Sequence, residues 1–252
     1  MPSKLFESSR LKIKRAQKHW WEITEVTRAF LGRTPFWLEL AEGFTADSKR
    51  WIVRVREEVP EDFSGIIGDV IHNLRAALDL MACELVRQNG NSDKDVYFPF
   101  AEDEVTLDKQ IRKKHFDRAS PEAVALIKKY KPYRNGNDPL RAIHDLDIID
   151  KHQTLIPFAS MIGAPDPSVR FGKAPLMFGP VRDGMSVTAA DIYRRSRIGA
   201  KAPGVNFTLR FPLIYMHPTG LKAAPLGSQE VIPSLKSLGD LVEGIIEAFA
   251  AL

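Results

Sequence analysis

The sequence has a single cysteine, Cys83, and no long apolar run. One thiol excludes an intrachain disulfide and a multi-cysteine zinc site. No stretch approaches the ~18 apolar residues of a membrane span, and the basic N-terminus lacks the apolar core of a signal peptide. Neither a dinucleotide-binding GxGxxG motif nor a P-loop occurs, so we expect no cofactor. Together these absences favour a soluble cytoplasmic protein without a membrane partner.

The composition that remains is that of an ordinary globular protein. The 252 residues are 44% hydrophobic and 27% charged, which permits a substantial core without cross-links. The formal net charge is only +4, but basic residues gather in four segments, at 12–18, 112–118, 128–134 and 194–201. Such segments permit contact with phosphate or nucleic acid, although solvated helix faces are their commoner use.

Helical periodicity dominates the first part of the chain. Apolar or small residues recur in steps of three and four from Phe6, which predicts one long amphipathic helix that ends at Gly32. Ser120 and Asp138 each precede a proline, an arrangement that typically opens a helix, and Ser234 is the expected cap of the last helix. Further helices are predicted over 61–89, 103–115, 120–131, 138–154 and 234–250.

Strand-like alternation occurs in two separated parts of the chain. Residues 36–40 and 51–57 alternate as an antiparallel pair does, with a loop at 43–49 between them. Val205 to Phe211 has the pattern of a half-buried strand, and residues 176–178 and 186–193 are expected to join it.

The order of these elements predicts the α+β class, because strands and helices do not alternate regularly. We expect a helical bundle with two long helices plus a small antiparallel sheet, assembled from both ends of the chain. A single domain is predicted over 1–252. Its parts are a helical core at about 3–31 and 61–155, a strand-rich part at about 160–232 and the C-terminal helix at 234–250.

On two predicted helices, His, Arg, Asp and Lys occupy one side where a solvent-exposed face would usually carry Lys, Glu and Gln. On the second long helix, a histidine, an arginine and an aspartate fall within an arc of roughly 60°, flanked by alanines and Cys83. We therefore expect another element to pack on this side, and the helix that begins near Asp138 carries a matching polar face. The candidate site comprises His72, Arg75, Asp79, His144, Asp147 and Lys151. Asp69, Asp150 and His152 are expected to have separate roles.

Two interpretations of this cluster assign it no acid–base catalysis: a structural network and a metal site. A structural network would pair Asp79 with Lys151 and Arg75 with Asp147, and would fix the register of the helices. A metal site would use both histidines together with Asp79 and Asp147, but two cations beside the site would repel a metal ion. We expect no metal for that reason.

A third interpretation is acid–base chemistry on a phosphodiester. His72 or His144 would move the proton, while Arg75 and Lys151 would hold the phosphate and stabilise the developing negative charge. RNA or another phosphate ligand is the favoured partner, with binding alone as a further option. The alternative function is that of a non-catalytic structural or interaction protein, compatible with a homo-oligomer.

Two motifs resemble those of an uncharacterised family of bacterial and phage-associated proteins. They are Gly68-Asp-x-x-His-Asn-Leu-Arg-x-Ala-Leu-Asp79 and His144-x-Leu-Asp-x-x-Asp-Lys-His152, within residues 66–155. That family typically has HNLRSALDHLA followed by DKHR, whereas this chain has Leu80 and Gln153 in place of the second histidine and the last arginine. The resemblance implies a bacterial protein and carries almost no functional knowledge.

A more distant similarity is to HEPN-like helical proteins, many of which are metal-independent ribonucleases. It implies a helical bundle with polar residues between the helices. The HEPN motif is an arginine followed after four to six residues by a histidine on the same helix, and no predicted helix contains it. Arg141 and His144, for example, are too close together, so no catalytic residue is carried over.

Overall fold

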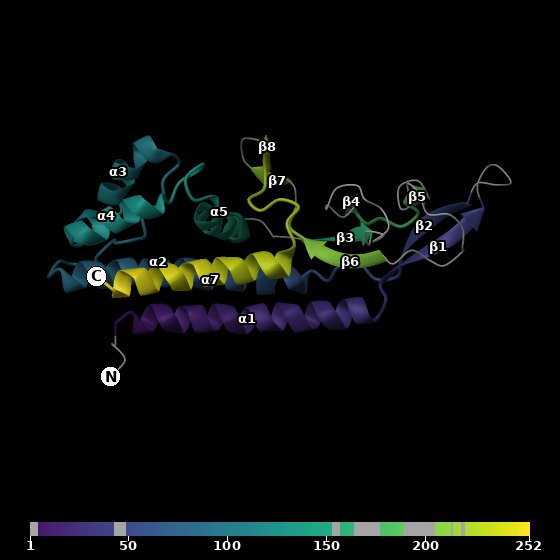
Figure 1. Cartoon of the computed structure of the whole chain (residues 1–252), viewed down its shortest axis with the longest axis horizontal. Coiled ribbons are helices and arrows are strands. Elements are labelled where there is room, and N and C mark those ends of the chain that lie inside the picture. Colours follow the sequence, from purple (N-terminus) through teal and green to yellow (C-terminus); the bar gives the residue numbers. More distant parts are fainter. Residues whose placement is uncertain are drawn as a thin grey trace, which may run out of the picture.

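Three long helices lie alongside one another in the structure, a computed structural model that describes residues 5–42, 49–152, 157–163, 177–188, 205–212, 214–217 and 220–252 (Figure 1). They are α1 (Glu7–Gly32), α2 (Asp62–Gln88) and α7 (Val231–Ala250), and each packs against the other two. Both long helices predicted in the first part of the chain are confirmed. Their periodic apolar positions, such as Ile13 and Ile23 of α1, are buried.

Shorter helices cover one side of this layer, and Ser120 caps one of them as predicted. They are α3 (Glu104–Lys113), the 3-10 turn η1 (Phe116–Arg118), α4 (Pro121–Tyr130) and α5 (Asp138–His152). Ser120 Oγ accepts a hydrogen bond from the Ala123 N–H at 3.2 Å, and Pro121 stands at the first helical position.

Asp138 does not cap the helix that it was expected to open. Asn137 Oδ1 instead accepts the hydrogen bond of the Leu140 N–H at 3.1 Å, and Asp138 is already helical.

The last helix begins earlier than predicted. The sequence pattern placed its cap at Ser234, but α7 starts at Val231 with Glu230 as the capping residue. Pro233 lies in the first turn, where a missing N–H removes no intrahelical hydrogen bond. The Ser234 N–H already donates to the Glu230 carbonyl at 3.2 Å, so Ser234 is a helical residue and not a cap.

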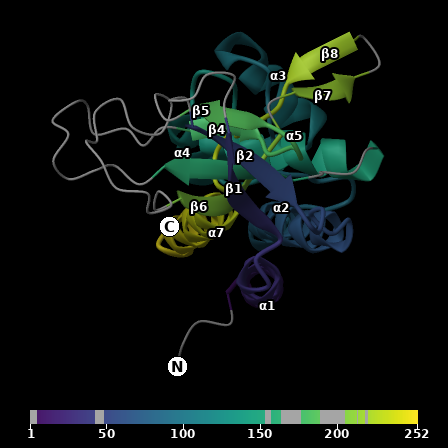
Figure 2. The ribbon, with the colours of Figure 1, turned by 90° about the vertical axis from the view of Figure 1, so that its right-hand side faces the viewer.

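Most of the described strands form small antiparallel sheets at one end of the helical layer, and one further pair lies on the same side of the layer as α5 (Figures 1 and 2). One has the order β1-β2-β5 and another the order β4-β3-β6, and β7 pairs with β8. Their bounds are β1 Phe36–Glu42, β2 Lys49–Val55, β3 Phe158–Gly163, β4 Met177–Pro180, β5 Ser186–Thr188, β6 Val205–Arg210, β7 Ile214–His217 and β8 Gly220–Ala223.

The α+β class is therefore confirmed, with the described strands divided among several small sheets. The predicted pairing of β1 with β2 is observed, in a register that places Phe36 opposite Val55. Strands β3, β7 and β8 were not predicted. Parts of the predicted segments at 43–49, 153–154, 176 and 189–193 lie outside the described residues.

In the described part of the chain, a buried hydrophobic cluster extends from the helices into the strands. It includes Phe30 of α1 and Leu209 of β6. The Phe36 ring of β1 lies 5.7 Å from the Phe30 ring and 5.3 Å from the Phe207 ring of β6, measured between centroids. This continuity agrees with one domain over 1–252, which stays a prediction.

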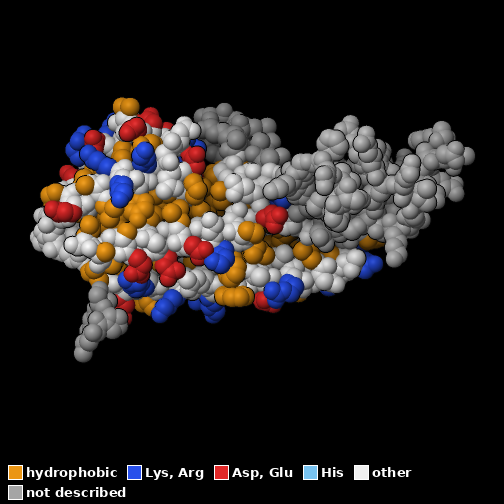
Figure 3. Space-filling model, viewed as in Figure 1, with side chains coloured by type: hydrophobic (Ala, Val, Ile, Leu, Met, Phe, Trp, Pro, Cys, Tyr) orange, Lys and Arg blue, Asp and Glu red, His pale blue; other side chains and the backbone are white. Residues whose placement is uncertain are grey.

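The surface of the helical part carries mixed charge. On the face seen in Figure 3, Lys and Arg side chains alternate with Asp and Glu side chains, and hydrophobic side chains are exposed between them. The basic segment at 194–201 lies outside the described residues. Among the helices that the structure describes, none combines the length and the apolar character needed to cross a membrane.

Candidate functional site

Helices α2 and α5 meet through the two polar faces that the sequence singled out. Gly68 of α2 contacts Asp150 of α5, and the ring of His72 contacts Asp147. Successive contacts therefore move toward the C-terminus of α2 and toward the N-terminus of α5. The predicted meeting of the two faces is observed, and the side chains divide into two groups along it.

The first group consists of His72, Asp147 and Lys151, and is called the His72 group below. The Asp147 carboxylate is 4% exposed, and its two oxygens contact His72 Nδ1 at 3.0 Å and Lys151 Nζ at 2.5 Å. The two basic side chains are 52% and 53% exposed. A carboxylate at Nδ1 orients the imidazole and leaves Nε2 as the acceptor of the neutral ring. Among the described residues, Nε2 of His72 has no partner.

Asp150 lies beside the His72 group. A Cβ at position 68 would lie only 2.3 Å from Asp150 Oδ1, so the carboxyl group rests on the bare backbone of Gly68. Burial raises the pKa of Asp150 above its ordinary value, and the negative charges of Asp147 and Asp69 raise that pKa further. Asp69 and Asp150 thus act electrostatically on each other next to the cluster, and the expectation that they have separate roles stays a prediction.

The second group consists of Arg75, Asp79 and His144, and is called the Arg75 group. Arg75 forms an ion pair with Asp79, whose Oδ1 also accepts a hydrogen bond from the Phe98 N–H at 2.8 Å. The Arg75 guanidinium lies 4.7 Å from the centre of the Phe100 ring and is almost enclosed. Arg75 and Asp79 therefore fasten the segment at 98–100 to α2.

His144 completes the Arg75 group as a stacking residue. Its ring lies parallel to that of Phe100, with 4.8 Å between centroids and 10° between planes. Burial and, next, the positive charge of Arg75 lower the pKa of His144 to about 3. The imidazole is therefore neutral near pH 7, and its buried Nδ1 has no hydrogen-bond partner in the described part of the chain.

The predicted interhelical ion pairs were wrong. Asp79 does not pair with Lys151, and Arg75 does not pair with Asp147; each cation instead contacts the carboxylate on its own helix. Both observed pairs have i,i+4 spacing, which brings side chains together without any interhelical register. His72 makes the hydrogen-bonded contact that crosses between the helices.

The arrangement offers no metal centre in the part of the chain that is described. No set of three or more His, Cys, Asp or Glu side chains is placed to hold an ion there. Within the cluster, Asp79 is bound by Arg75, and His144 is stacked on Phe100. The residues that the metal interpretation combined are thus separated into different environments.

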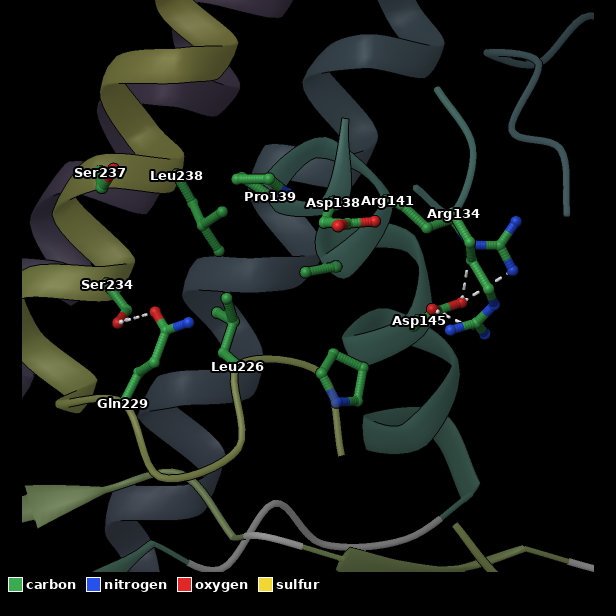
Figure 4. Close-up of a pocket in the computed structure, with 12 residues that line it drawn as sticks. Arg134, Asp138, Pro139, Arg141, Asp145, Leu226, Gln229, Ser234, Ser237 and Leu238 are labelled. Carbon is green, nitrogen blue, oxygen red and sulfur yellow. Dashed lines mark hydrogen bonds and ion pairs between the residues drawn. The ribbon is translucent and has the colours of Figure 1, made fainter. Parts of the chain in front are cut away.

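A second polar network was missed by the sequence argument. Asp145 of α5 accepts from Arg141 Nε at 3.0 Å and pairs with Arg134 at 2.9 Å, beside a cavity of about 310 Å³ (Figure 4). The side chains of Leu226 and Leu238 contribute an apolar part of its wall. The i,i+4 spacing of Arg141 and Asp145 was the available signal.

Comparison with known proteins found no match to this chain among protein-family models, curated proteins or solved structures. The motif resemblances therefore remain expectations, and the proposal of a function rests on the geometry of the site.

Proposed function

We propose that the His72 group is an acid–base site that cleaves a phosphodiester, with RNA as the substrate. The observation that supports this most directly is the contact of His72 Nδ1 with the buried carboxylate of Asp147, 3.0 Å away. A histidine oriented by a carboxylate at one nitrogen and open at the other is a common arrangement for a general base.

The chemistry assigns a different task to each member of the group. His72 Nε2 accepts the proton of the attacking hydroxyl, and the Asp147 carboxylate stabilises the imidazolium that forms. The Lys151 ammonium is half exposed beside them and can neutralise charge on the phosphate. Arg75 was expected to share that task, but its guanidinium is almost enclosed against Asp79 and Phe100, whereas Lys151 is half exposed, so Lys151 is the better candidate.

Helix α1 brings further positive charge to the same side of α2. Lys12 Nζ donates to Asn73 Oδ1 at 3.4 Å, and Asn73 is the residue that follows His72. Lys12 belongs to the basic segment at 12–18, in which Lys14, Arg15 and Lys18 are exposed. A polyanion bound at His72 would therefore also meet Lys12 of α1, which favours a nucleic acid over a small phosphate.

The alternative is a structural network without chemistry. It is favoured by the burial of Asp147 and by the pairing of both its oxygens, since buried ion pairs often fix geometry. The two functions differ in what the loss of His72 costs. A structural histidine contributes stability, whereas a catalytic one that is half exposed contributes little to stability and much to the rate.

A comparison of His72→Ala with His152→Ala tests the proposal. His152 is an exposed histidine next to Lys151 and serves as the matched control. We expect His72→Ala to lower the rate of RNA cleavage by about 10²- to 10⁴-fold, the usual contribution of a general base, with little change in Tm. The control should retain the rate of the wild type.

The opposite result is equally clear. Absence of cleavage by the wild type on single-stranded and double-stranded RNA, together with a lower free energy of unfolding for His72→Ala, would establish the structural network instead.

A further inference from the structure

We infer that Asp150 is the second proton-transfer group of this site, coupled to His72 and placed to protonate the leaving oxygen of the phosphodiester. The inference rests on the proposed function, because it assigns one more catalytic group to the same site. It starts from the close approach of the Asp150 carboxyl group to Gly68.

The backbone of α2 is open to Asp150 because position 68 has no side chain. Gly68 is buried, and a Cβ there would lie 2.3 Å from Oδ1 and 2.5 Å from Oδ2 of Asp150. Position 68 is one helical turn before His72, and Asp150 is nearly one turn after Asp147. The Asp150 carboxyl group and the His72 imidazole therefore occupy neighbouring positions along the same interhelical contact.

The neighbours of Asp150 compensate a negative charge only in part, because the effects of His72 and Lys151 are smaller than those of burial, Asp147 and Asp69. Among the described residues its carboxyl group makes no hydrogen bond and no ion pair. Lys151 and Asp147 are the charged neighbours on its own helix, and Asp69 and His72 face it from α2. Lys151 is already bound to Asp147. From α1, His19 Nε2 lies 4.0 Å from Asp69 Oδ2.

The half-buried carboxyl group thus has two other carboxylates near enough to act on it, while the nearby ammonium is bound to Asp147. Such surroundings disfavour the ionised form, so Asp150 retains a proton to higher pH than an ordinary aspartate does. His72 is in the contrasting environment, with a carboxylate at Nδ1 and a solvent-exposed ring. The site therefore combines a carboxyl group that retains its proton with an imidazole that is open at Nε2, an arrangement that suits separate acid and base roles.

The two groups account for every proton in the cleavage of RNA. His72 Nε2 takes the proton of the 2′-hydroxyl, and that oxygen forms the new bond to phosphorus. The bond from phosphorus to the 5′ oxygen breaks, and the Asp150 carboxyl group gives its proton to that oxygen. The products are a 2′,3′-cyclic phosphate and a free 5′-hydroxyl, while solvent returns a proton to Asp150 and removes one from His72.

Replacement of Gly68 tests whether the position of the Asp150 carboxyl group matters, apart from the general effect of replacing a glycine of α2. The Cβ of Gly68→Ala would force the Asp150 carboxyl group away from α2. Gly65 lies on the same helix and has open space where a Cβ would be, so Gly65→Ala is the matched control. The helix propensity gained by replacing glycine is shared by the two variants.

The first measurement is an NMR titration of the Asp150 carboxyl carbon and the His72 ring, which requires no activity. We expect Asp150 to titrate above the ordinary aspartate value of about 3.9, and the His72 signals to report the same event. The coupling should vanish in Gly68→Ala and persist in Gly65→Ala. An ordinary titration of Asp150, unseen by His72, would overturn the inference.

The second measurement is the pH dependence of RNA cleavage by Asp150→Asn. We expect a fall of about 10²-fold or more and the loss of one limb of a bell-shaped profile. An unchanged profile in an active protein would overturn the inference while leaving His72 as the base. A wild type that cleaves no RNA would refute the proposed function, and the NMR coupling would still decide whether Asp150 exchanges protons with His72.

Discussion

His72 and His144 show how one residue type acquires two properties within a single pair of helices. His72 is half exposed and contacts the carboxylate of Asp147. His144 lies against the ring of Phe100, with its pKa lowered to about 3. The sequence offered both as proton carriers, because spacing reveals that residues share a face but not how deeply each is enclosed. Burial depends on the segment around Phe100, which is distant in the sequence.

The low pKa of His144 predicts a specific pH dependence of stability. An unfolded histidine titrates near pH 6.5, so below that pH the unfolded chain binds a proton that the folded protein rejects. The stability is therefore complete above about pH 6.5 and is lost as the pH falls toward about 3. The slope from this one group is at most about 1.4 kcal/mol per pH unit.

Urea unfolding of the wild type and of His144→Phe at several pH values measures this contribution. Phenylalanine keeps a flat ring against Phe100 but has no proton to bind, so the variant should lose less stability on acidification. At pH 7.5 the difference between the two free energies of unfolding measures the change in packing, and it is subtracted from the differences at lower pH. Parallel curves for the two proteins down to pH 4 would show that His144 does not stay neutral in the folded state.

At the scale of elements, helices α4 and α7 begin in different ways although both have a serine near the start. Ser120 caps α4 through its Oγ. Ser234 instead lies inside α7, and its Oγ donates a long hydrogen bond of 3.4 Å to Gln229 Oε1. We expect Ser120→Ala to cost about 1 kcal/mol, the usual value of an N-cap, and Ser234→Ala to stay within about 0.5 kcal/mol.

Chemical denaturation of both variants provides the comparison. The pair is internally controlled, because each variant removes one hydroxyl near the start of a helix. Equal losses would mean that Ser234 has a capping role which the geometry of α7 does not show.

The elements that could be predicted are those whose signals are local. The 3.6-residue apolar period of α1 and the Ser120-Pro121 cap depend only on neighbours in sequence. Strand β3 (Phe158–Gly163) was missed because its sequence, FASMIG, lacks the alternation of a half-buried strand. Its pairing with β6 is decided by contacts between distant segments.

The candidate site was predictable to a similar extent. The encounter of α2 with α5 follows from two polar faces on amphipathic helices. The choice of ion partners does not, because a cation such as Arg75 has carboxylates available on both helices and the i,i+4 partner requires no precise docking. The position of Asp150 against Gly68 depends on the register of the two helices, which the periodicity leaves open.

At the scale of the whole molecule, helices and strands share one core. The Phe36 ring lies between Phe30 of α1 and Phe207 of β6, and Phe30 also contacts Phe63 of α2, with 5.8 Å between ring centres. Aromatic residues bury large areas, so these contacts couple the strands energetically to the helical layer. A chain built in this way should unfold as one cooperative unit.

Two probes of different regions test that expectation. Far-UV circular dichroism follows the helices, and the fluorescence of a Trp20→Phe/Trp21→Phe protein follows the remaining tryptophans, Trp37 and Trp51, which belong to β1 and β2. We expect coincident unfolding midpoints, because the described helices and strands contribute to the same buried cluster. Phe36→Ala should lower both midpoints together and cost about 3–5 kcal/mol, whereas Val105→Ala, at an exposed position of α3, should change neither. Two resolved transitions, with Phe36→Ala moving only the fluorescence, would mean that the strands form a unit of their own.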